Sequence, residues 1–142
     1  MKPVHILLVE DNAGDILLTK EALSEANPDI HVSVVTDGEQ ATDFLDKAGG
    51  YADAEMPNLI LLDINLPRKN GHEVLLHIKS DERLRHIPVI ILTTSSFDKD
   101  VKDAYRNFAS CFITKSVEVD EFMEIVAKIV NLWVGIAKLP VL

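Results

Sequence analysis

The chain has 142 residues, 47% of them hydrophobic, and a formal net charge of −9, which suits one domain with one core spanning residues 1–142. The acidic charge argues against binding to nucleic-acid phosphates or to anionic membrane surfaces. No apolar run approaches a transmembrane or signal segment and the only cysteine is Cys111, so we expect a cytoplasmic protein.

Short aliphatic runs alternate with helical patterns along the chain. The runs predict strands at residues 4–9, 31–35, 59–63, 89–93 and 111–114. The intervening stretches predict helices at residues 14–26, 39–48, 72–80, 98–107 and 119–133. This alternation indicates a parallel sheet between helices, and five units are too few for an eight-fold barrel. We therefore predict an α/β fold of the flavodoxin-like, doubly wound (βα)5 type, a three-layer sandwich with strand order 2-1-3-4-5.

Polar residues stand where the predicted strands end. Glu10 and Asp11 follow the first strand, Asp63 ends the third, Thr93 ends the fourth and Lys115 follows the fifth. In this strand order the first and third strands are neighbours, so three carboxylates would converge and repel unless a cation such as Mg²⁺ lay between them. A carboxylate there can attack a phosphoryl group, while a hydroxyl and an ammonium stabilise its oxygens. Each residue alone also suits a turn, a cap or a surface position, and only the combination favours chemistry.

Four segments resemble the receiver domain of two-component response regulators. Residues 6–11 look like the first strand of that family with its acidic pair, and residues 62–71 look like its phosphoacceptor loop. Residues 88–93 match the fourth strand with its terminal hydroxyl, and residues 112–115 match the fifth strand with an aromatic residue before the lysine. The resemblance extends from about residue 4 to residue 133.

The resemblance implies a phosphoacceptor site and its cation. A sensor histidine kinase would transfer a phosphoryl group to Asp63, and Mg²⁺ would be held by Asp11, Asp63 and the backbone carbonyl of Asn65, with Glu10 close by. Such a domain also catalyses its own phosphorylation from a phosphodonor and a slow loss of the phosphoryl group. Thr93 and Phe112 would act as the switch that changes the face formed by the fourth helix, fifth strand and fifth helix.

The implied function is that of a stand-alone response regulator. One alternative is a pseudo-receiver that acts only as an interaction module, and another is a phosphorelay intermediate without output of its own. A flavodoxin-like nucleotide or flavin binder shares the topology, but Glu10 and Asp11 would repel phosphate where that class needs a Gly/Ser/Thr loop.

Several positions depart from the family pattern, and two of them bear on the backbone. Ser116 follows Lys115, where the family has a proline after a cis peptide bond, which leaves the isomer of this bond open. The fourth helix lacks the glycine that usually ends it, and we expect Asn107 to supply the left-handed cap.

The end of the chain, residues 134–142, is an apolar extension. It either folds back on the core or forms a homodimer contact together with the output face. The Lys-Ser junction and this tail are similar to the small regulators that serve bacterial, especially cyanobacterial, phytochromes, which makes a phytochrome a possible partner kinase. No histidine has a histidine at i+4 or a cysteine partner, so no zinc site is expected among His5, His31, His72, His77 and His86.

Overall fold

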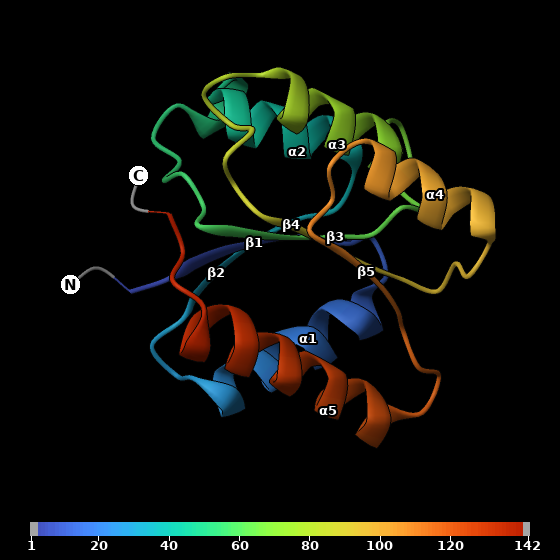
Figure 1. Cartoon of the computed structure of the whole chain (residues 1–142). Coiled ribbons are helices and arrows are strands. Elements are labelled where there is room, and N and C mark those ends of the chain that lie inside the picture. The colour runs from blue at the N-terminus through green and yellow to red at the C-terminus, as the bar shows by residue number, and fades with distance from the viewer. Residues whose placement is uncertain (1–2, 141–142) are drawn as a thin grey trace.

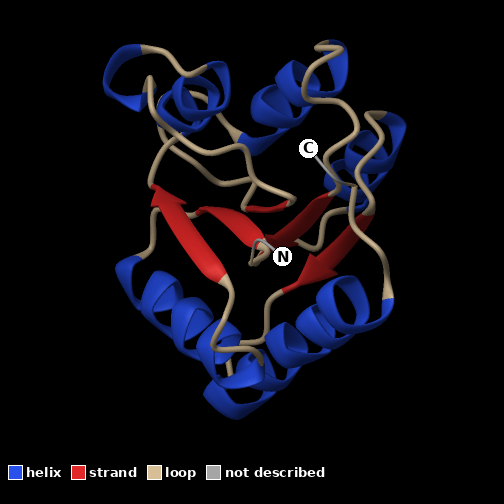
Figure 2. Ribbon diagram, turned by 90° about the vertical axis from the view of Figure 1, so that its left-hand side faces the viewer, coloured by secondary structure: helices blue, strands red, loops and turns tan. Residues whose placement is uncertain are grey.

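The computed structural model describes residues 3–140 as a three-layer α/β sandwich (Figures 1 and 2). Five parallel strands form one sheet in the order β2-β1-β3-β4-β5, as predicted. The strands are β1 (His5–Val9), β2 (His31–Val35), β3 (Leu59–Leu62), β4 (Val89–Thr93) and β5 (Cys111–Thr114). One face is covered by α1 (Ala13–Ala26) and α5 (Val119–Val130), and the other by α2 (Gly38–Asp46), α3 (Gly71–Ser80) and α4 (Asp98–Arg106).

The central strands are buried on both faces because their side chains alternate between two apolar layers. Leu7, Ile60 and Leu62 pack in the layer under α2 and α3. Leu8 and Leu61 pack in the opposite layer, against α1 and α5. Each such side chain stabilises the fold by about 1.5–3 kcal/mol. Packing on both faces therefore fixes the strands, and with them the positions of the residues that follow the strands.

The strand register brings distant parts of the sequence to one edge of the sheet. Val9 of β1 pairs with Leu62 of β3, so the residues after each strand emerge side by side. Thr93 at the end of β4 pairs with Thr114 at the end of β5. The carboxyl ends of these four strands thus lie along one edge.

The end of α4 corrects the prediction for Asn107. Its φ of −96° is not left-handed, and its N–H still donates to the carbonyl of Asp103. The left-handed residue is Phe108, with a φ of 68°. The Phe108 N–H donates to Tyr105 and the Ala109 N–H donates to Ala104, which is the Schellman arrangement of a helix C-terminus. The left-handed position that favours glycine is therefore residue 108, one residue later than we expected.

Phe108→Gly is expected to stabilise the protein. Left-handed backbone costs a side-chain-bearing residue about 1–2 kcal/mol, whereas glycine loses about 0.5–1 kcal/mol of chain entropy, so the net gain is about 0.5–1 kcal/mol. Little packing is lost because Phe108 is 74% exposed. Urea unfolding measures the change, and Lys102→Gly inside α4 is the control, expected to cost about 1 kcal/mol. A loss of stability in Phe108→Gly would contradict this account.

The described part of the C-terminal segment, residues 131–140, packs on the core. The helix α5 passes into a π-helical segment, Asn131–Ile136. Trp133, Val134 and Leu139 pack against the apolar layer under α1 and α5. Residues 141 and 142 of the predicted apolar extension lie outside the described residues. Within residues 3–140, no helix is long and apolar enough to cross a membrane.

Candidate functional site

Asp63 stands directly after β3, at the centre of the carboxyl edge. Its side chain is 8% exposed. Its backbone N–H donates to the carbonyl of Val9 at 3.0 Å, and its Oδ1 accepts the N–H of Asn65 at 3.1 Å. Asn65 itself is exposed. A central strand therefore holds the Asp63 carboxylate in place, while Asn65, two residues later, remains open to solvent.

Three carboxylates converge at this edge, as the strand order predicts. Oxygens of Glu10, Asp11 and Asp63 all lie within 4.8 Å of one another. Glu10 is buried, its N–H donates to Val35, and its Oε1 accepts the N–H of Asn12 at 3.0 Å. Asp11 is exposed, so the group of acids has one open side.

Lys115 reaches into the same group of acids from the end of β5. Its Nζ donates to Glu10 Oε2, to Asp63 Oδ2 at 3.2 Å and to Asp15 Oδ2 at 3.0 Å. Its backbone N–H donates to the carbonyl of Thr93 at 2.7 Å. The peptide bond between Lys115 and Ser116 is trans, which answers the question that the missing proline left open. A trans junction thus suffices to bring the ammonium to the acids.

Burial and opposite charge set the protonation of this cluster. The pKa of Glu10 is raised to about 7, because burial outweighs the hydrogen bond from Lys115, which acts to lower it. Burial disfavours the charged form of Lys115, but the hydrogen bond to Glu10 and the charge of Asp63 outweigh it, so its pKa is raised. Lys115 is therefore a permanent cation at neutral pH and the counter-charge of the acids.

The acids form a donor set that fits a divalent cation. Oxygen ligands, an open side and space for water are what Mg²⁺ requires, since it retains several of its waters. Glu10, Asp11 and Asp63 provide carboxylate oxygens, and exposed Asp11 leaves room for water and for a phosphoryl oxygen. The residues present therefore fit a magnesium-type ion.

Thr93 and Phe112 occupy different environments. Thr93 is fully buried at the end of β4, and its Oγ1 accepts the N–H of Ser95 at 3.4 Å. Phe112 is half-buried and packs against the apolar layer under α2, α3 and α4. Its backbone N–H donates to the hydroxyl of Tyr105 at 3.1 Å, which ties β5 to α4. Thr93 thus shares the edge with Asp63, whereas Phe112 lies beneath a helix.

Three polar contacts of this edge were not predicted from the sequence. Asp15, which it placed only at the start of a helix, is a hydrogen-bond partner of Lys115. Ser95 donates to Asp100 at 2.5 Å, and His72 lies 3.0 Å from the same carboxylate, so α3, α4 and the loop after β4 are tied together. The sequence did contain one sign that Asp15 could join the site, because it is an acid one helical turn after Asp11. The network around Asp100 has no local sequence signal.

Gly71→Ala is expected to disturb the site through its backbone. A Cβ at Gly71 would lie 2.3 Å from the Asp63 carbonyl oxygen and 2.6 Å from Ile64 Cα, so α3 and the loop must separate. Such overpacking costs about 1–3 kcal/mol. Gly50→Ala is the matched control, because its Cβ would meet nothing within 4 Å, and a change within about 0.5 kcal/mol is expected. Equal stabilities in urea unfolding would contradict the close approach.

A doubly wound sheet that gathers three acids and a lysine at its carboxyl edge defines the class of receiver domains. The chain belongs to the response regulator receiver domain family, which matches residues 6–127. The function of this family is phosphorylation-dependent signalling.

Relatives match nearly the whole chain. Response regulator Rcp1 of Synechocystis sp. is 41% identical over 138 residues, covering 97% of this chain and 94% of Rcp1. The probable methanogenesis regulatory protein FilR2 of Methanothrix harundinacea is 37% identical over 140 residues, covering 97% and 88% of the two chains. Both relatives are thus regulators that this chain matches over most of their length.

Solved structures agree with this assignment. The phosphorylated cyanobacterial phytochrome response regulator RcpA has a TM-score of 0.95 at 44% identity, over 98% of this chain and 99% of RcpA. The Mn²⁺-bound form of Rcp1 has a TM-score of 0.95 at 40% identity, over 98% of this chain and 100% of Rcp1. Rcp1 therefore binds a divalent metal ion, and this chain is a receiver domain homologous to phytochrome response regulators.

Proposed function

We propose that this protein is a response regulator that accepts a phosphoryl group on Asp63 from a sensor histidine kinase. One observation carries the proposal: a buried carboxylate lies within 4.8 Å of two further acids and 3.2 Å from an ammonium. An Asp63 oxygen would attack phosphorus as the bond from phosphorus to the histidine nitrogen breaks, and the electron pair would return to the imidazole.

The other residues of the edge would support this transfer. We assign to Asp11, Asp63 and the Asn65 carbonyl the binding of Mg²⁺, with Glu10 beside them. When bound, the ion screens the charge on the phosphoryl oxygens. Lys115 would contact one of these oxygens and Thr93 would donate a hydrogen bond to another.

The output would follow from the movement of Thr93 toward the phosphoryl group. Ser95 is linked to the Thr93 hydroxyl through its N–H and to Asp100 of α4 through its own hydroxyl, which supports a connection from the site to α4. Phe112, which packs beneath α4, would turn inward as this loop moves. The face formed by α4, β5 and α5 would then change.

Labelling with a small phosphodonor tests this function. The protein is incubated with acetyl phosphate and Mg²⁺, and the modified residue is located by borohydride reduction and mass spectrometry. Beryllofluoride binding is the second readout. If neither reagent modifies the protein while a partner still binds, the chain acts as an interaction module. Label that passes onward to a histidine protein would instead indicate a phosphorelay intermediate.

The partner kinase is proposed from the relatives. RcpA is a cyanobacterial phytochrome response regulator and RtBRR and AtBRR are bacteriophytochrome response regulators, at 44%, 41% and 36% identity. A phytochrome with a histidine kinase module is therefore the first candidate. Phosphotransfer profiling against the sensor kinases of the same source tests this, and preferential labelling by a kinase that is not a phytochrome would overturn it.

A homodimer through the α4, β5 and α5 face is the proposed assembly. Strand β5 is an edge of the sheet. Exposed apolar side chains lie in the segments before and after it, at Phe108 and Val117, and a third, Ile136, ends the segment after α5. Exposed apolar side chains that gather on one face mark interaction surfaces. Trp133 and Val134 pack on the core, and among the described tail residues 134–140 Ile136 is the exposed large apolar side chain.

Val117→Asp is expected to shift the protein from dimer to monomer. Val117 is fully exposed, so a charge there costs nothing in the monomer but desolvates in the interface. Sedimentation velocity measures the change, and Leu76→Asp on α3 is the control, exposed and apolar but away from this face. A wild-type monomer, or a dimer in both variants, would remove this assembly.

A further inference from the structure

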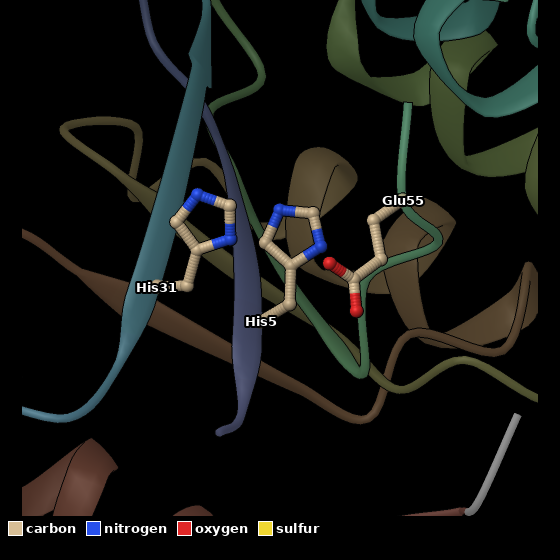
Figure 3. Close-up of side chains that lie close together, drawn as sticks. All are labelled: His5, His31 and Glu55. Carbon is tan, nitrogen blue, oxygen red and sulfur yellow. The ribbon is translucent and has the colours of Figure 1, made fainter. Parts of the chain in front are cut away.

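Three side chains with metal-ligand chemistry meet at the amino edge of the sheet, opposite to Asp63. His5 is the first residue of β1, His31 is the first residue of β2, and Glu55 lies in the segment before β3. One potential ligand atom from each residue lies within 4.8 Å of the other two. Figure 3 shows His5 between His31 and the carboxylate of Glu55.

The fold, rather than sequence spacing, brings these residues together. His5 and His31 are partners in the parallel register of β1 and β2, and their rings stack with centroids 4.7 Å apart. The segment that carries Glu55 is fastened beside β1, because Asn58 exchanges two hydrogen bonds of 2.8 Å with the backbone of His5. The juxtaposition is therefore built into the sheet.

His5 is buried yet has a ring nitrogen that lacks a hydrogen bond. Its exposure is 2%, and its Nε2 lies 2.8 Å from the hydroxyl of Ser33. By distance and angle Nδ1 makes no hydrogen bond, although the backbone of Met56 lies close enough to act as a hydrogen-bond partner that raises the pKa of the ring. In Figure 3 this nitrogen is on the side of the ring that faces Glu55. A buried polar atom without a partner is rare and indicates a ligand or a missing donor.

The electrostatics favour the neutral, ligating form of this imidazole. Burial lowers the pKa of His5 and outweighs the backbone of Met56, which acts to raise it, while the smaller effects of His31 and Glu55 oppose each other. If Nε2–H donates to Ser33, the lone pair of Nδ1 points toward the cluster. A hydrogen bond from the other ring nitrogen is the arrangement that orients metal-binding histidines.

We propose that His5, His31 and Glu55 bind a zinc ion, with water as the fourth ligand. Two imidazoles and one carboxylate are a common zinc donor set, whereas Mg²⁺ prefers oxygen ligands alone. Zinc bonds of about 2.0–2.2 Å place tetrahedral ligand atoms roughly 3.4 Å apart. His31 and Glu55 are exposed and can rotate to close the remaining gap. The ion would link β1, β2 and the segment before β3.

The competing explanation for the position of His5 and His31 is a stack of aromatic rings that binds no metal. The stack continues from His5 to Phe44, at 6.1 Å between centroids, and from Phe44 to Tyr51 at 5.4 Å. Stacking accounts for the position of the two imidazoles. It does not account for the buried Nδ1 of His5, which has no hydrogen bond by distance and angle.

Calorimetric titration with ZnCl₂ in the presence of excess MgCl₂ tests the proposal, because Mg²⁺ occupies the acids around Asp63. Wild-type protein is expected to bind one zinc ion. His31→Ala and Glu55→Gln are expected to weaken binding at least about tenfold, since even the loss of an outer-shell partner costs 10–100-fold. His86→Ala, which removes an exposed histidine outside the cluster, should bind as wild type does. Circular dichroism checks that each variant is folded.

Cobalt substitution gives a second readout that does not depend on stability. Tetrahedral Co²⁺ with imidazole ligands absorbs in the visible range, and this band should appear in wild type and His86→Ala but not in His31→Ala. Absence of zinc binding by wild type in excess Mg²⁺ would leave only the stacked aromatic edge. Equal affinities of wild type, His31→Ala and Glu55→Gln would place the ion elsewhere.

Discussion

Lys115→Met is expected to destabilise the metal-free protein by about 3 kcal/mol, because removing one partner of a buried ion pair costs about 3–5 kcal/mol. The Lys115 side chain is 3% exposed and faces the carboxylates of Glu10, Asp15 and Asp63. Methionine fills a similar volume but leaves these acids without a counter-charge. A proton on Glu10, whose pKa burial raises to about 7, relieves part of the repulsion and favours the lower end of the range.

The same substitution should make stability depend strongly on Mg²⁺. Without the ammonium, a divalent cation is the remaining group that can neutralise the acids, so Mg²⁺ should stabilise the variant more than it stabilises wild type. Urea unfolding in EDTA and in Mg²⁺ measures both effects. Lys99→Met is the control, because its side chain is 86% exposed and its pair with Asp103 contributes at most about 0.5 kcal/mol. Equal stabilities of the two variants in EDTA would show that Lys115 is not the counter-charge.

The fold was predictable because its strongest signals are local. The run from Leu59 to Leu62 has no polar face, and the structure buries every one of its side chains. Strand order then followed from general rules on parallel sheets. Helix ends were less accurate: α2 ends at Asp46, two residues before the predicted end, because Lys47 adopts the left-handed cap with a φ of 56°.

The candidate site was predictable in part for a related reason. Glu10 and Asp63 follow strands directly and Thr93 ends one, so the strand pattern alone places them at one edge. Contacts that depend on side-chain reach were not predictable, such as the hydrogen bond from Lys115 to Asp15.

Cross-strand neighbours were not predictable from spacing. His5 and His31 are 26 positions apart and meet only through the register of β1 and β2. A search for histidines one helical turn apart misses this arrangement. The sequence also left open whether the apolar tail packs on the core or stays exposed for a contact. The structure shows both, since Trp133 packs on the core while Ile136 is 80% exposed.

Asp63→Asn is expected to abolish labelling by acetyl phosphate, with at least a roughly 100-fold loss relative to wild type, because an amide cannot act as the carboxylate nucleophile. The variant should fold. Its amide oxygen can still accept the Asn65 N–H, and the change removes one negative charge from a cluster in which acids outnumber Lys115. Unfolding in urea and circular dichroism separate this loss of reactivity from a loss of structure.

Asp15→Asn is the matched control for this loss. Asp15 and Asp63 both accept a hydrogen bond from Lys115, at 3.0 and 3.2 Å, but only Asp63 belongs to the convergent group with Glu10 and Asp11. The Asp15 variant should therefore retain labelling within a few-fold of wild type. Labelling of Asp63→Asn at the wild-type level would place the acceptor on another carboxylate of the edge, whereas loss of labelling in both variants would show that the environment of Lys115, and not the nucleophile alone, limits the reaction.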